Sequence, residues 1–196
     1  QGAPPASTRR TALALLLVAG LPAGCQRSGF HSLDVTGAPW GRDFRLRDPD
    51  GRERTLADFR GRAVLIFFGF TQCPDVCPTA LSRAAEVQRL LGADGNRLQV
   101  IFVTVDPERD TPPVLAEYTR AFGTGFLGLY GDMAQTAATA SEFRVIYQKV
   151  PTGGSYTMDH SAISYVFDPR GQLRLAVRHN DTAAVMAEDI GRLLKD

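Results

Sequence analysis

The pattern of apolar and polar residues predicts alternating strands and helices from about residue 40 onward. Residues 63–70 (AVLIFFGF) form a continuous apolar run, and residues 98–105 (LQVIFVTV) form a second, mostly apolar one. Such runs are typical of strands buried on both faces of a sheet. Between them, residues 78–91 carry apolar side chains at helical spacing and are followed by Gly92. A glycine just past the last turn indicates the end of a helix.

The rest of the chain continues this alternation and ends in a helix. Further helices are predicted at residues 113–122, 133–143 and 182–194, and further strands at 145–150, 164–167 and 172–178. The sequences DPDG (48–51) and DPRG (168–171) predict turns, and the first of them indicates a small N-terminal hairpin between residues 43–47 and 55–59. This order predicts an α/β protein with a thioredoxin-like fold, a central mixed sheet flanked by helices.

The N-terminal residues follow the pattern of an export signal. Two arginines precede an uncharged run rich in Ala and Leu over residues 11–24, which is shorter than the roughly 20 residues of a membrane span. The run ends in LPAGC, which resembles a bacterial lipoprotein processing site with Cys25 as the lipidated residue. Pro22 departs from that pattern, since an aliphatic residue is usual there. A plain signal peptide or an uncleaved anchor is the alternative.

These observations divide the chain into three parts. Residues 1–25 are expected to be a signal peptide, residues 26–39 a flexible tether rich in Ser and Gly, and residues 40–196 the folded domain. The lipid would anchor the protein to a membrane of the bacterial cell envelope, with the domain in the periplasm or at the outer face of the membrane.

Composition excludes several classes of protein. With 196 residues and 44% hydrophobic side chains, the chain suffices for one domain with a sizeable core. The net charge is +1, and the arginines are scattered without a basic run, so we expect no nucleic-acid partner. Three cysteines are too few for a disulfide-stapled scaffold. Each cysteine therefore calls for a chemical explanation of its own.

The chemistry is expected at Cys73 and Cys77, which lie four residues apart after the first buried run. Each precedes a proline, and a residue before proline is kept out of the helical conformation. Pro78 suits the first position of the next helix, which places Cys77 at or near the N-cap, where the helix dipole lowers a thiol pKa. The pair suits a disulfide or a thiophilic ion such as Cu(I) or Zn(II). Two structural core cysteines would not explain the flanking prolines.

His160 is the candidate for a third ligand. It lies in the sequence YTMDHS (156–161), just before a predicted strand. Because loops of neighbouring strands meet at one edge of a sheet, this loop could face the cysteines. Asp159 or a backbone carbonyl would then orient the imidazole. A lone histidine before a strand is more often a hydrogen-bonded structural residue, and the spacing alone leaves both interpretations open.

Three motifs in order resemble the Sco/SenC family of membrane-tethered, thioredoxin-fold copper proteins, which help to assemble the dinuclear copper A centre of cytochrome c oxidase. They are FGFTQCPDVCP (68–78), VDPERDTP (105–112) and DHS (159–161). The resemblance covers residues 40–194, roughly, and implies copper as the bound metal, Cu(I) first and Cu(II) as a second option. The implied partners are the copper A-bearing oxidase subunit and, beyond it, other periplasmic copper chaperones or thiol reductants.

Position by position, the resemblance implies that Cys73, Cys77 and His160 are the copper ligands. It also implies that Asp106 lies near the metal loop without being a ligand. Many members of the family keep a transmembrane helix, so the lipoprotein-like Cys25 is a departure in the mode of anchoring.

The residues are compatible with three classes of function. The first is a non-enzymatic copper metallochaperone, and the second is a thiol–disulfide oxidoreductase in which Cys73 and Cys77 alternate between dithiol and disulfide. Outside the cytoplasm, the metal-free pair is expected to oxidise to that disulfide. The third class, a peroxidase, is disfavoured because no threonine lies three residues before either cysteine. Thioredoxin-like reductases usually have two residues between the cysteines and a proline opposite, whereas this chain has three residues and His160.

Overall fold

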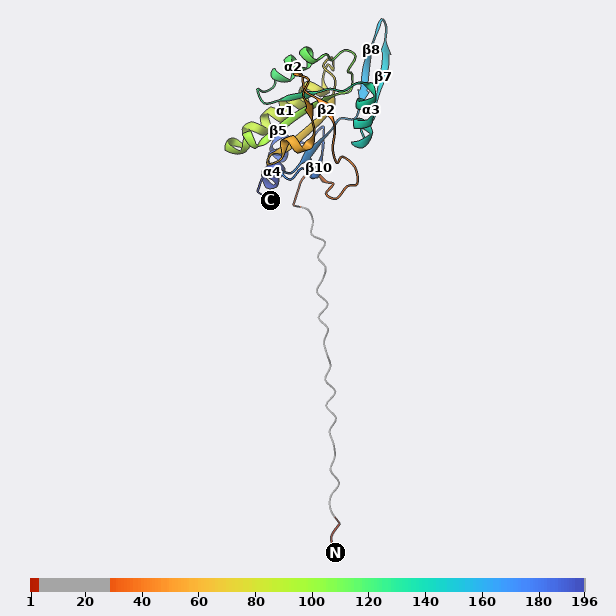
Figure 1. Ribbon diagram of the computed structural model, residues 1–196. Coiled ribbons are helices and arrows are strands. Elements are labelled where there is room, and N and C mark those ends of the chain that lie inside the picture. Colours follow the sequence, from red (N-terminus) through yellow and green to blue (C-terminus); the bar gives the residue numbers. More distant parts are fainter. Residues whose placement is uncertain (4–28, 196) are drawn as a thin grey trace.

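The computed structural model, which describes residues 1–3 and 29–195, contains a central six-stranded mixed sheet (Figure 1). The strand order is β1-β10-β9-β4-β5-β6. Two further pairs, β2 with β3 and β7 with β8, form separate two-stranded sheets. The strands are β1 (Leu33–Asp34), β2 (Leu46–Arg47), β3 (Glu53–Arg54), β4 (Ala63–Gly69), β5 (Leu98–Thr104), β6 (Leu127–Leu129), β7 (Tyr147–Thr152), β8 (Ser155–His160), β9 (Ile163–Phe167) and β10 (Leu173–Arg178).

Helices cover both faces of this sheet. The α-helices are α1 (Val76–Leu90), α2 (Pro112–Arg120), α3 (Met133–Glu142) and α4 (Ala183–Leu193), with 3-10 helices η1 (Leu56–Phe59) and η2 (Gly92–Arg97). The ring of Phe102 packs on Tyr118 of α2, with ring centres 5.4 Å apart. The ring of Phe68, on the opposite face of the sheet, packs on Phe143, the C-cap residue of α3, with ring centres 5.2 Å apart.

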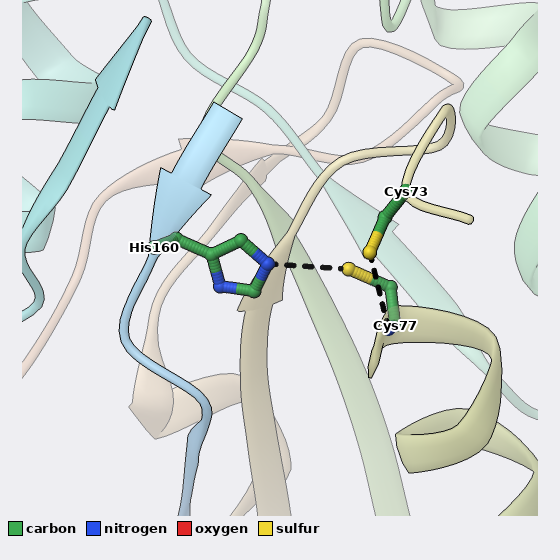
Figure 2. Close-up of side chains that lie close together, drawn as sticks. All are labelled: Cys73, Cys77 and His160. Atoms are coloured by element: carbon green, nitrogen blue, oxygen red, sulfur yellow. Dashed lines mark hydrogen bonds between the residues drawn. The ribbon is translucent and has the colours of Figure 1, made fainter. Parts of the chain in front are cut away.

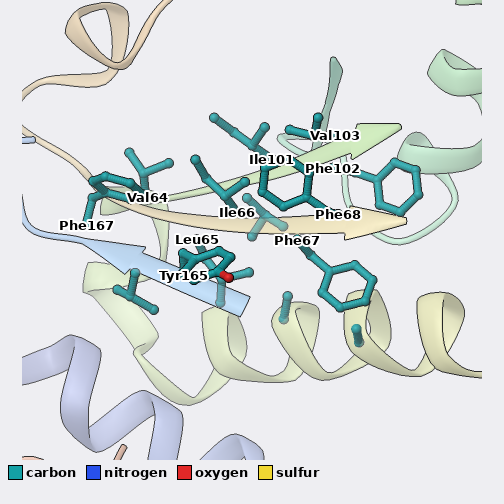
Figure 3. Packing of buried hydrophobic residues seen from close by; sticks show 14 of the residues in the cluster. Val64, Leu65, Ile66, Phe67, Phe68, Ile101, Phe102, Val103, Tyr165 and Phe167 are labelled. Atoms are coloured by element: carbon teal, nitrogen blue, oxygen red, sulfur yellow. The ribbon is translucent and has the colours of Figure 1, made fainter. Parts of the chain in front are cut away.

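The centre of the core is strand β4, which is buried along its whole length (Figure 3). It pairs parallel to β5 and antiparallel to β9. Successive side chains of a strand point to opposite faces, so Phe67 and Phe68 fill the two sides of the sheet. Such double burial explains why the sequence of β4 is continuously apolar rather than alternating.

The predicted thioredoxin-like class and most predicted elements are confirmed, with differences at the ends. Residues 55–59, predicted as the second strand of the N-terminal hairpin, lie mainly in η1, and the hairpin consists of β2 and β3 alone. Asp58 accepts a hydrogen bond from the Thr55 backbone N–H at 2.7 Å, which favours a helical turn there. Strand β6 was not predicted, because three residues, LGL, are too short a pattern to be recognised.

The prediction of a tether over residues 26–39 is wrong for the part that the structure describes. The backbone N–H groups of His31 and Ser32 donate to the carboxylate of Asp189 on α4, at 2.9 and 2.8 Å. Leu33 and Asp34 then pair with the edge strand β10. Polar composition suggested a linker, but a buried carboxylate partner and a free sheet edge fix this segment. The chain reaches the domain near the C-terminal end of α4, opposite the β7–β8 hairpin (Figure 1).

The β7–β8 hairpin projects from the domain (Figure 1). Its pairing runs from Tyr147 opposite His160 to Thr152 opposite Ser155 at the tip. The polar sequence SYTMDH predicts a loop where β8 lies, and in the structure only Met158 of this strand is buried. None of the helices within residues 1–3 and 29–195 has the length and apolar character of a membrane span.

We expect Asp189→Ala to release the N-terminal segment and lower the free energy of unfolding by about 1–3 kcal/mol, because buried backbone donors lose their acceptor. Urea denaturation measures the stability, and hydrogen exchange measures the protection of the His31 and Ser32 amides. Glu188→Ala is the matched control, since it removes only the exposed His31–Glu188 pair and should cost less than about 1 kcal/mol. Unchanged amide protection in Asp189→Ala would contradict the docking.

Candidate metal centre

Three structural elements bring the candidate donors together. Strand β4 ends at Gly69, the chain bends through Cys73 and Pro74, and α1 begins at Val76. The N-cap residue is Asp75, so Cys77 lies within the first turn of α1, two residues beyond the N-cap. This is close to the predicted position. His160 is the last residue of β8 and approaches from the other side of the site (Figure 2).

The two sulfurs and the imidazole point toward one another (Figure 2). One ligand atom each from Cys73, Cys77 and His160 lies within 4.8 Å of the others. The Cys77 Sγ lies 3.4 Å from His160 Nε2, and the Cys77 backbone N–H donates to Cys73 Sγ at 3.4 Å. Cys77 is fully buried, whereas Cys73 and His160 are half-buried. Both cysteines are free thiols in this structure.

Gly69 makes room for the inner sulfur. A Cβ atom added to Gly69 would lie 2.6 Å from Cys77 Sγ and 2.8 Å from the Phe102 ring. Any larger side chain would therefore collide with the sulfur or the ring. The absence of a side chain at the end of β4 lets the thiol of Cys77 rest directly against the strand.

The imidazole of His160 is held in one orientation. Its Nδ1 lies 3.1 Å from the carbonyl oxygen of Ser161, and a carbonyl can only accept, so Nδ1 carries the hydrogen. In the neutral ring, Nε2 then has a free lone pair directed at the sulfurs. Phe67 and Phe70 contact the ring edge-to-face, each at 5.9 Å. A backbone carbonyl thus orients the ring, whereas the side chain of Asp159 is exposed.

The two thiols differ strongly in acidity. The pKa of Cys73 is lowered to about 5, chiefly because the Cys77 side chain donates a hydrogen bond to it, with help from the backbone N–H groups of Asp75 and Cys77. The pKa of Cys77 is raised, because its thiol donates that hydrogen bond and is buried. At neutral pH, the metal-free site therefore holds a thiolate at Cys73 and a thiol at Cys77.

Asp106 is buried and is not part of the donor group. It accepts hydrogen bonds from Arg109 and from the Tyr156 hydroxyl, the latter at 2.8 Å. Arg109 in turn donates to the side chain of Gln72, next to Cys73, at 3.1 Å. Asp106 is therefore linked to the site through Arg109, a residue that sequence analysis did not single out. No spacing rule connects an arginine after β5 with a hairpin almost 50 residues later.

A buried carboxylate also supports the start of the cysteine loop. Asp110 accepts from the backbone N–H and the hydroxyl of Thr71, at 3.0 and 2.6 Å, and from the hydroxyl of Thr104 at 2.6 Å. Burial raises its pKa. These bonds fix the chain between Gly69 and Cys73 against the end of β5.

A sequence profile described as SCO1/SenC matches residues 34–195. The chain belongs to the SCO1/SenC family. The bovine mitochondrial protein SCO2 homolog is 44% identical over 133 residues, which are 66% of this chain and 50% of that protein. The chain thus spans about half the length of this relative.

Two solved structures of family members support the same fold. The copper-bound structure of ScoI from Bradyrhizobium japonicum has a TM-score of 0.70 and 42% identity, and the match covers 76% of this chain and 96% of that one. The copper-bound structure of Sco1 from yeast has a TM-score of 0.71 and 34% identity, and the match covers 79% of this chain and 87% of that one.

The predicted lipidation site, Cys25, lies outside the residues that the structure describes.

We expect the low pKa of Cys73 to appear as reactivity in the reduced, metal-free protein. A pKa lowered to about 5 means that the thiolate is present above that pH and is lost as the pH falls through it. Iodoacetamide labelling of Cys73, followed by mass spectrometry, should therefore be nearly constant from pH 8 to 6 and halve near pH 5.

Cys77→Ala removes the main hydrogen-bond donor and should move the midpoint of this labelling curve toward the usual thiol value of about 8.5. Buried Cys77 should stay unlabelled in the unsubstituted protein. A midpoint near 8.5 in the unsubstituted protein would contradict the assigned thiolate.

Proposed function

We propose that this family member binds one copper ion through Cys73, Cys77 and His160 and acts as a copper chaperone. The observation that carries the proposal is the approach of His160 Nε2 to within 3.4 Å of Cys77 Sγ, in a group whose three donor atoms lie within 4.8 Å of one another. A dithiol working only in redox exchange has no need of an imidazole at this position.

The donor set fits Cu(I) best among the common metals. Two thiolates and one imidazole are soft or borderline ligands, which suit Cu(I). Structural zinc sites almost always have four protein ligands, and a zinc site with three protein donors adds a water as the fourth ligand, so the preference for Cu(I) rests on the softness of the two thiolates. In a trigonal site with metal–ligand bonds of about 2.0–2.3 Å, ligand atoms would lie about 4 Å apart, so small rotations of the side chains would complete the geometry. Cu(II) is the second option.

We further propose that the copper is passed to the copper A-bearing subunit of cytochrome c oxidase. Membership of the SCO1/SenC family supports a role in assembling this enzyme. Delivery by ligand exchange requires a site that a partner can reach, and the half-buried Cys73 and His160 meet that requirement. Other periplasmic copper chaperones or thiol reductants are the further partners that we propose.

The redox chemistry of the thiols fits this role as a supporting step. A metal-free Cys73–Cys77 pair outside the cytoplasm would oxidise to an intramolecular disulfide, and copper binding requires its reduction. The thiol–disulfide oxidoreductase remains the less favoured function, because it leaves the orientation of His160 unexplained.

The anchor belongs to the same proposal. We infer that a lipid on Cys25 tethers the protein to a membrane of the bacterial cell envelope, with the domain in the periplasm or on the outer face of the membrane. The support is the apolar run of residues 11–24, which ends in Ala-Gly-Cys.

The copper site is tested by measuring Cu(I) affinity in competition with a chromogenic chelator. The reduced protein should bind one Cu(I), and His160→Ala should weaken binding by about 10–100-fold or more, since even the loss of a residue that only orients a ligand costs that much. Cys73→Ser and Cys77→Ser should weaken it further, because a hydroxyl is a poor ligand for Cu(I).

His179→Ala is the matched control, since this histidine follows β10 and lies outside the donor group. It should leave the affinity within about twofold. Equal affinities of His160→Ala and the unsubstituted protein would refute the three-ligand site and favour the oxidoreductase.

Lipidation is tested by mass spectrometry of the mature protein from bacterial membranes. We expect an N-terminal Cys25 that carries diacylglycerol, and Cys25→Ser should block processing, because lipid transfer needs the sulfur. A mature N-terminus beyond residue 25, or a retained segment 1–25, would rule out the lipid anchor without affecting the copper site.

A further inference from the structure

Arg109 connects three segments that meet at the donor group. It lies in the loop between β5 and α2, and its side chain is 17% exposed. It forms an ion pair with Asp106 in its own loop, donates to Gln72 Oε1 in the cysteine loop at 3.1 Å, and donates to the backbone oxygen of Tyr156 in β8 at 2.8 Å. One guanidinium group thus bridges the cysteine loop and the hairpin that carries His160.

The hairpin closes over this guanidinium group through an aromatic ring. The guanidinium carbon lies 3.7 Å from the centre of the Tyr156 ring and 5.9 Å from that of Phe70. The Tyr156 hydroxyl donates to Asp106 at 2.8 Å, so Asp106, Arg109 and Tyr156 form a closed cycle of contacts. Phe70 also packs edge-to-face on the ring of His160. The cycle is therefore in contact with the wall of the donor site.

The hairpin has few other attachments among the described residues. Strands β7 and β8 pair only with each other. At the base, the Ser161 N–H donates to the Ile146 carbonyl at 2.9 Å, a bond that closes the hairpin itself. The apolar contacts with the domain are made by the buried Met158, by the partly buried Tyr147 and by the His160 ring against Phe67 and Phe70. A second ion pair joins Lys149 to Glu108, but both of those side chains are about half exposed. The cycle of Asp106, Arg109 and Tyr156, in which Asp106 is buried and the other two are half-buried, is thus the main polar contact that aligns β8 with the cysteine loop.

We propose that Arg109 is a positioning residue that holds the β7–β8 hairpin so that His160 faces Cys77. A planar guanidinium group can make these bonds at once and stack on Tyr156, whereas an ammonium group cannot. Without the Arg109 guanidinium group, Asp106 and the Tyr156 carbonyl lose the donor that they share. Strand β8 then loses the contact that fixes its position relative to the cysteines. The effect on copper binding rests on the proposed function, but the positioning itself is a property of the metal-free protein.

The positioning is tested by NMR on the reduced, metal-free protein. The unsubstituted protein should show a nuclear Overhauser contact between the His160 ring Hε1 and the Cys77 Hβ protons. Arg109→Met and Arg109→Lys should weaken or abolish this contact while contacts within β4, β5 and β9 persist. Lys149→Met is the matched control, since it removes an exposed cation from the same hairpin and should leave the contact intact.

If the Arg109 variants do not fold, Tyr156→Leu provides the test from the hairpin side, because it removes the stacked ring and the hydroxyl while the Asp106–Arg109 pair stays. The same loss of the His160–Cys77 contact is expected. An intact contact in any folded variant of Arg109, or in Tyr156→Leu, would overturn the proposal.

A double-mutant cycle on Cu(I) affinity separates positioning from general destabilisation. If Arg109 acts through His160, Arg109→Met should weaken binding about tenfold in the unsubstituted protein and less than twofold in His160→Ala. An equal factor in both backgrounds would mean that Arg109 does not act through His160. If the unsubstituted protein bound no Cu(I), the proposed function would fail, and the NMR contact would still decide the role of Arg109.

Discussion

The antiparallel pairing of β4 with β9 is the constraint on which the candidate site depends. Phe67 in β4 lies opposite Ser164 in β9, so the end of β4 and the start of β9 meet at the same edge of the sheet. The cysteine loop follows the first strand and His160 precedes the second. Because side chains alternate along a strand, a register shift of one residue would turn every buried side chain of β9 to the wrong face. The hydrophobic core thereby fixes which loops meet.

The acidities of the two cysteines follow from their different depths in this framework. Cys77 is enclosed by α1, the β4 backbone at Gly69 and the Phe102 ring, and burial opposes its ionisation. Cys73 lies nearer the surface and receives hydrogen bonds from Cys77 and from backbone N–H groups. The sulfur of Cys73 is therefore charged and reachable. The sulfur of Cys77 keeps its proton until a species that binds sulfur more strongly displaces that proton. A thiophilic ion is such a species.

How much the sequence predicts depends on whether the signal is local. Apolar runs, continuous in β4 and nearly so in β5, predict these two strands, and the prolines after Cys73 and Cys77 predict the bent loop and the start of α1. The three candidate donors were identified from motifs, and the fold brings them together. By contrast, the docking of His31 and Ser32 depends on Asp189, about 157 residues away. The strand character of β8 depends on pairing with β7 rather than on its own polar sequence, so neither feature has a local signal.

The two halves of the donor set are attached to the domain by different kinds of contact. The cysteines lie between β4 and α1 and are held by the close-packed core. His160 belongs to a hairpin that is joined to the domain by a few polar bonds, by aromatic contacts of Tyr156 and His160, and by apolar packing of Met158 and Tyr147. Contacts of the second kind open more readily in local fluctuations, because less buried surface must be exposed. The geometry of the dithiol is therefore set by the fold as a whole. The position of the imidazole is set by Phe67 and Phe70, which contact its ring, and by the few side chains that hold the hairpin.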